Sequence, residues 1–129
     1  MENKPLSLLE LNSLVRRSIT SCLPDEYWVQ AELSDVRVNY SGHCYLEFVQ
    51  KDATGNALLA KARGIIWANV FTRLRSYFER ETGQAFVSGL KVLVKVTVDF
   101  HELYGYSLTV VNIDPSRRPS GLRKTITQL

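Results

Sequence analysis

Aromatic and basic side chains alternate in three short stretches of the sequence. They are Arg37, Tyr40, His43 and Tyr45 in the first stretch, Lys61, Arg63 and Trp67 in the second, and Phe100 and Tyr104 in the third. Aromatic rings can stack on bases while cations follow the phosphate backbone, which is how proteins hold single-stranded nucleic acid without reading its sequence. Lys61 and Arg63 are two residues apart, so they would share one face of a strand. These nine residues form the candidate site, and single-stranded nucleic acid is its candidate ligand.

The overall charge gives little support to this interpretation. The chain has 129 residues, a net charge of +3 and a pI of about 9.0. Residues 1–114, however, hold 12 Lys and Arg against 13 Asp and Glu, a net charge of −1. The basic excess comes from Arg117, Arg118, Arg123 and Lys124. The case for a nucleic-acid ligand therefore depends on where charges lie locally.

Catalytic and metal-binding patterns are not found in the sequence. The two cysteines, Cys22 and Cys44, belong to no Cys-x-x-Cys pair, and His43 and His101 have no zinc-binding spacing. His43 and Cys44 are adjacent, so on a strand their side chains point to opposite faces and cannot exchange a proton. We therefore expect no catalytic residue, no metal site and no cofactor in this chain.

The hydrophobic period divides the chain into seven elements. Apolar residues at helical spacing predict helices over 8–22, opened by the capping box Ser7-x-x-Glu10, and over 68–81. Alternating residues predict five strands, over 27–40, 43–49, 57–66, 90–100 and 106–113. Leu33 and Val36 differ in parity, so a β-bulge is expected near Ser34 in a long, bent first strand.

Five short strands with a helix between the third and fourth match the OB-fold, a five-stranded Greek-key barrel. The predicted fold class is thus an all-β core with added helices, the extra one being N-terminal. A generic α+β sheet with two helices is the alternative. Residues 1–115 would form one domain, and the basic tail 116–129 is expected to be flexible. The N-terminus has no signal peptide and no stretch approaches the ~18 apolar residues of a membrane span, which favours a cytoplasmic protein.

Three segments also resemble a known family. They are Leu6–Asn12 (LSLLELN), Trp28–Ser34 (WVQAELS) and Ser41–Phe48 (SGHCYLEF). In this order they resemble the Leu-Ser-x-x-Glu-Leu-Asn opening, the Trp-Val-x-Gly-Glu-Ile-Ser strand and the Ser-Gly-His-x-Tyr-Phe-x-Leu hairpin of the exodeoxyribonuclease VII large-subunit family. The resemblance covers residues 6–115. Ala31 departs from the family glycine, and Ala68 follows Trp67 where the family tends to have arginine.

The resemblance implies a single-stranded DNA-binding module of a nuclease. In that family an N-terminal OB-fold domain binds the strand, a downstream domain with a divalent metal hydrolyses it, and further helices bind a small subunit. The 129 residues are expected to hold the binding module without the cleaving domain. An OB-fold protein-interaction or assembly module, and a stand-alone single-stranded DNA-binding protein, are the alternatives.

Overall fold

The structure is a computed structural model that describes residues 4–115, so the predicted tail 116–129 lies outside the described residues. Two helices and five strands follow one another as the sequence predicts. They are α1 (Leu8–Cys22), β1 (Glu26–Val38), β2 (Cys44–Lys51), β3 (Leu58–Ile66), α2 (Ala68–Thr82), β4 (Lys91–His101) and β5 (Gly105–Ile113). None of the helices in this part of the chain is long and apolar enough to cross a membrane.

The five strands close into a barrel in the order β1-β2-β3-β5-β4. Neighbours are antiparallel except β3 and β5, which run parallel. β1 serves both halves, since Glu26–Glu32 pair with β4 and Glu32–Val38 pair with β2. Its register shifts between Leu33 and Asp35. This confirms the predicted OB-fold barrel and bulge, and excludes the open α+β sheet.

The first strand ends two residues earlier than the sequence predicts. The side-chain oxygen of Asn39 accepts hydrogen bonds from the backbone N–H groups of Ser41 (3.0 Å) and His43 (3.0 Å). This local turn competes with the β-ladder and removes Asn39 and Tyr40 from it. The predicted strand over 27–40 is therefore corrected to Glu26–Val38, and Tyr40 lies in the β1–β2 turn.

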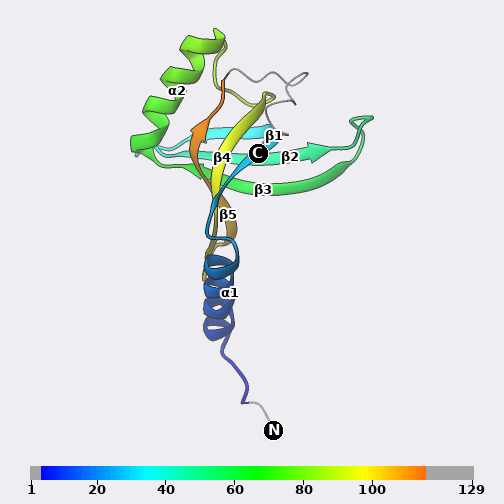
Figure 1. The fold of residues 1–129 in the computed structure, drawn as a ribbon, viewed down its shortest axis with the longest axis vertical. Helices are drawn as coiled ribbons and strands as arrows, with labels where there is room; N and C mark the ends of the chain where they lie inside the picture. The colour runs from blue at the N-terminus through cyan, green and yellow to red at the C-terminus, as the bar shows by residue number, and fades with distance from the viewer. Residues whose placement is uncertain (1–3, 116–129) are drawn as a thin grey trace.

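The core fills the barrel and the contact between the barrel and α2. Every strand contributes a fully buried side chain, and these are Leu33 (β1), Cys44 (β2), Ile66 (β3), Val94 and Val96 (β4) and Val110 (β5). Phe71, Leu74 and Phe78, three or four residues apart, are the buried face of α2. α2 therefore covers one end of the barrel (Figure 1).

The N-terminal helix α1 extends away from the barrel (Figure 1), and none of its residues is buried. Its capping box is present, with Ser7 and Glu10 exchanging hydrogen bonds. A polar contact near the β4–β5 turn holds it, where Asn12 donates to the Glu102 carbonyl oxygen (2.9 Å) and Arg16 donates to the Glu102 carboxylate (2.7 Å). The Arg16 hydrogen bond lowers the pKa of Glu102. The apolar residues of α1 thus support no core, unlike those of α2.

Candidate nucleic-acid interface

A groove of about 1170 Å³ runs over the outer face of the barrel. Strand alternation explains its position, because Cys44, Leu46 and Phe48 of β2 are buried while Tyr45 and Glu47 between them face outward. Six of the nine predicted site residues line the groove. They are Arg37 (β1), Tyr45 (β2), Arg63 (β3), Trp67, Phe100 (β4) and Tyr104.

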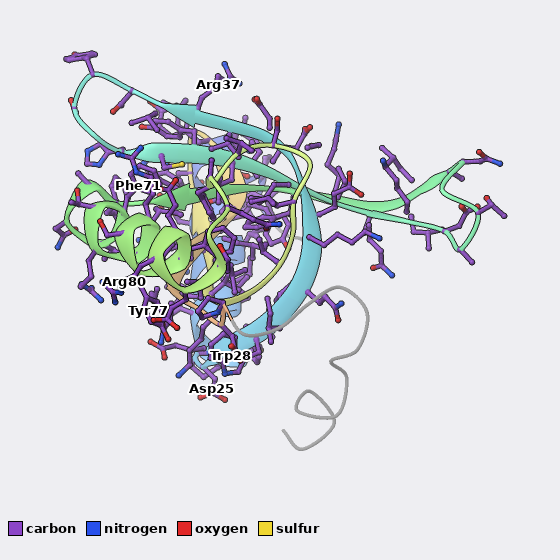
Figure 2. All side chains as sticks on the ribbon, turned by 90° about the horizontal axis from the view of Figure 1, so that it is seen from above. Asp25, Trp28, Arg37, Phe71, Tyr77 and Arg80 are labelled. Atoms are coloured by element: carbon purple, nitrogen blue, oxygen red, sulfur yellow. The ribbon has the colours of Figure 1, made fainter. Side chains whose placement is uncertain are left out.

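The remaining three predicted residues lie outside the groove lining. Tyr40 is fully exposed in the β1–β2 turn. Lys61 pairs with Val49, toward the far end of the β2–β3 hairpin that projects from the barrel (Figure 1, Figure 2), and its ammonium lies 3.6 Å from the Glu47 carboxylate. His43 packs against the ring of Trp67 and is not part of the groove lining. The structure therefore brings together two of the three predicted cations and four of the predicted aromatic residues.

His43 holds Trp67 at the edge of the groove. The Trp67 side chain makes no capping hydrogen bond at the start of α2. Instead, His43 Nδ1 accepts a hydrogen bond from the backbone N–H of Ala68, at 3.0 Å. The imidazole therefore carries a lone pair on Nδ1, and its ring meets the Trp67 indole edge-on with centroids 5.0 Å apart. Trp67 nevertheless remains 47% exposed. His43 thus has a structural role beside Trp67, whose indole stays partly exposed.

Arg63 ties the β4–β5 hairpin to β3 beside the groove. Its Nη2 donates to the backbone carbonyl oxygens of Tyr104 and Tyr106. A guanidinium has five N–H donors, so three remain for a ligand. The same side chain can therefore fix the position of Tyr104 and contact a phosphate.

Tyr104 lies at the tip of this hairpin and is 65% exposed. Its ring is tilted by 32° against that of His101, with centroids 4.8 Å apart. His101 Nδ1 accepts the Leu103 N–H at 3.0 Å, which orders the turn. His101 also lines the groove; the sequence places it between Phe100 and Tyr104 in the third stretch, although the nine predicted site residues do not include it. An exposed, ordered aromatic pair is suited to stacking on a base.

Three carboxylates line the groove, and they are missing from the predicted site. Asp35 accepts from Arg37 at 2.9 Å, Glu47 faces Lys61, and Asp99 accepts from the hydroxyls of Thr97 and Thr109. Strand parity could have found Glu47, which shares the outer face with Tyr45. With two arginines and three acids, the groove lining has a net charge near −1. A polyanionic ligand would therefore gain more from the aromatic surface of this groove than from its charge.

Two observations on the described residues concern metal-binding and nucleophilic side chains. Residues 4–115 hold no group of three His, Cys, Asp or Glu side chains that could bind a metal ion. Cys44, beside His43 in sequence, is fully buried, and this burial raises the pKa of its thiol to about 11. A buried, protonated thiol is a poor nucleophile.

Cys22, in contrast, is exposed at the end of α1. We expect a disulfide reagent at pH 8 to modify one thiol per folded chain rapidly, and the second only after denaturation. A Cys22→Ser variant should then show no rapid reaction. Two rapidly reacting thiols in the native chain would show that Cys44 is accessible and contradict the packing described here.

Comparison with known proteins agrees with the geometry. The chain is 37% identical over 114 residues to the exodeoxyribonuclease 7 large subunit of Deinococcus radiodurans. The match covers 85% of this chain and 27% of that protein, so the chain spans about a quarter of its relative. This confirms the resemblance seen in the three sequence segments. The profile of the OB-fold nucleic acid binding domain family matches residues 6–114, which include the whole of α1, the barrel and α2. The chain therefore belongs to the family of OB-fold nucleic acid binding domains.

Proposed function

We propose that this chain binds single-stranded DNA without sequence preference, in the groove lined by Tyr45, Trp67 and Tyr104. The observation that carries the proposal is the exposure of these three rings in one groove, beside the two arginines Arg37 and Arg63. Rings supply stacking that tolerates any base, and no base-reading pattern is needed. A groove without a positive net charge favours a strand whose bases, rather than its phosphates alone, touch the protein.

The similarity to the exodeoxyribonuclease 7 large subunit suggests what this binding would serve in a longer protein. In an exodeoxyribonuclease-like large subunit, the module would hold the strand and present it to a phosphodiester-cleaving domain that uses a divalent metal. A small subunit would be a further partner of such an assembly. The cytoplasmic location predicted from the sequence is part of this proposal.

A titration at several salt concentrations tests the binding itself. With Arg37 and Arg63 as the groove's phosphate contacts, the groove should contribute about −1.4 to the logarithmic slope with which the affinity for a fluorescent oligothymidylate falls with salt, from ~−0.7 per phosphate. Arg37→Gln/Arg63→Gln measures this contribution, because the basic tail is present in both proteins and adds equally to each slope. Absence of binding at ~50 mM salt, where phosphate contacts are strongest, would contradict the proposal and leave a protein-interaction role for the fold.

Glu47 provides a sharper test of the groove. Glu47→Gln keeps an acceptor for the Ser34 hydroxyl, removes a negative charge from the groove and frees Lys61. We expect the affinity to rise about 1.4- to fivefold, because an exposed charge contact contributes ~0.2–1 kcal/mol. Asp25→Asn, in the exposed turn before β1 and outside the groove, is the matched control and should change the affinity little. An equal effect of the two substitutions would assign the gain to net charge and not to the groove.

A further inference from the structure

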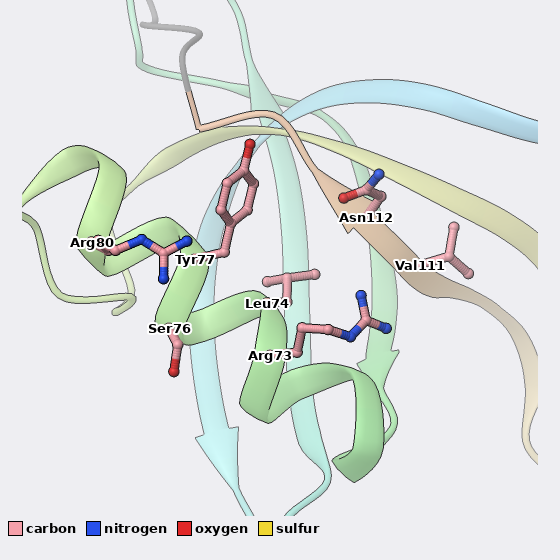
Figure 3. Close-up of a pocket in the computed structure, with 7 residues that line it drawn as sticks. All are labelled: Arg73, Leu74, Ser76, Tyr77, Arg80, Val111 and Asn112. Carbon is pink, nitrogen blue, oxygen red and sulfur yellow. The ribbon is translucent and has the colours of Figure 1, made fainter.

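A second, smaller concavity lies between α2 and β5 (Figure 3). It has a volume of about 490 Å³, and its lining residues are Arg73, Leu74, Ser76, Tyr77, Arg80, Val111 and Asn112. Among the described residues, the lining contains two guanidinium groups and no carboxylate, the reverse of the charge balance in the groove. The predicted site included none of these residues. We call this concavity the α2–β5 pocket.

The two arginines are available to a ligand. Within residues 4–115, Arg73 makes no hydrogen bond or ion pair, and Figure 3 shows its side chain extending toward β5. Arg80 has one carboxylate neighbour, Glu81, 3.8 Å from its Nε, so its two terminal nitrogens are free. Its guanidinium carbon lies 5.9 Å from the centroid of the Tyr77 ring, which is 39% exposed. Cations beside an exposed ring are the components that hold a nucleic-acid strand.

A β-bulge builds the opposite wall of the pocket. Val110 pairs with Val96 and Asn112 pairs with Lys95, so Val111 is an extra residue in β5. Val110 and Ile113 are both buried, which leaves Val111 and Asn112 together on the outer side. Without the bulge, strand alternation would turn one of these two side chains inward. The bulge therefore provides both an apolar contact and an amide at the same wall.

The pocket continues the groove. On β5, Ser107 and Thr109 line the groove and Val111 lines the pocket, so the step from one to the other is two residues, about 6.7 Å. On the helix side, Trp67 lines the groove and immediately precedes α2, which carries Arg73. The two concavities therefore adjoin along β5, and on the helix side Arg73 lies six residues, about 9 Å along the helix axis, beyond Trp67.

The spacing of the arginines suits an extended polyanion. Arg73 and Arg80 are seven residues apart on α2, about 10.5 Å along the helix axis. Such a separation fits two phosphates of one backbone better than an isolated phosphate. Leu74, buried at the pocket floor, offers no polar partner that would compete.

We propose that the α2–β5 pocket is a second subsite for single-stranded nucleic acid, where Arg73 and Arg80 hold the phosphates of the strand as it leaves the groove and Tyr77 offers a further ring. The inference rests on the proposed function of the groove and extends the strand's path to the α2 end of the barrel. A ligand confined to the groove would not reach this pocket, whereas a longer one would engage both.

Two oligothymidylates of about 5 and about 15 nucleotides, within the range of OB-fold site sizes, distinguish these cases. They are titrated into the full chain and into Arg73→Gln/Arg80→Gln. The matched control is Arg17→Gln/Arg75→Gln, which removes the same charge from two exposed positions outside both concavities. Thermal melting establishes that each variant is folded.

We expect Arg73→Gln/Arg80→Gln to bind the long oligonucleotide about tenfold more weakly, with a salt slope shallower by about 1.4. Its affinity for the short oligonucleotide, and both affinities of the control, should remain close to those of the unchanged protein. If the two double variants behave alike, or if short and long oligonucleotides weaken equally, the subsite is refuted while the groove stands. If the unchanged protein binds neither oligonucleotide, the proposed function fails and the subsite fails with it.

Discussion

Trp67→Ala should weaken the binding of single-stranded oligonucleotides by about 5- to 150-fold, which corresponds to the ~1–3 kcal/mol that one stacked base contributes. The indole lines the groove, is 47% exposed and is held edge-on by His43. Because the backbone of Trp67, and not its side chain, begins α2, the substitution should leave the fold intact. Fluorescence anisotropy with a labelled oligothymidylate measures the change in affinity.

The β4–β5 hairpin offers a second test of stacking, Tyr104, together with its matched control, Tyr106. Tyr104 lines the groove, whereas Tyr106 is also exposed but lies outside the lining. Each accepts a hydrogen bond from Arg63 through its backbone carbonyl oxygen, which alanine retains. Tyr104→Ala should therefore weaken binding and Tyr106→Ala should not. If Trp67→Ala and Tyr104→Ala both bind with unchanged affinity while folded, stacking in the groove is refuted.

Gly64→Ala should destabilise the barrel by about 1–3 kcal/mol, the usual cost of forcing extra volume into a packed core. Gly64 is buried in β3, and a Cβ there would overlap the ring of Phe48, itself buried in β2. The backbone of Gly64 is not left-handed, so the requirement for glycine comes from this ring alone. Urea denaturation should show a lower midpoint with an unchanged slope.

Phe48→Leu tests whether that ring is the cause. The substitution alone should destabilise the protein, but it should cost less in the Gly64→Ala background, because the smaller side chain makes room for the new methyl group. Additive free energies of unfolding for the two substitutions would mean that the strain arises elsewhere.

The sequence predicted the fold well because the barrel depends on local signals. Alternation located all five strands, and the parity change between Leu33 and Val36 located the bulge in β1. The capping box at Ser7 marked the start of α1. The end of β1 was predicted wrongly because the Asn39 side chain captures two backbone N–H groups, a competition that hydrophobic period does not report.

The candidate site was harder to predict because the groove forms only when the five strands close into a barrel, which brings residues from distant strands together. Parity places Arg63 and Lys61 on the same face, but only the closed barrel shows that β5 and the Tyr104 hairpin lie beside Arg63 while Lys61 lies farther out along the β2–β3 hairpin. The acids Asp35 and Asp99 come from different strands and meet in the groove for the same reason. The sequence-based hypothesis assigned ligand binding to local cations and to the aromatic rings near them. The acids in the groove weaken the part assigned to the cations and make the aromatic rings the more important contacts.

The central claim, that a single strand lies in the groove on the outer face of the barrel, is tested most directly by photo-crosslinking. An oligothymidylate containing 5-iodouracil is irradiated in complex with the full chain, and the linked residues are identified by mass spectrometry. We expect most crosslinks at Trp67, Tyr104 and Tyr45, competed away by unlabelled oligothymidylate. Efficient, competable crosslinking that misses all three of these rings would contradict the account.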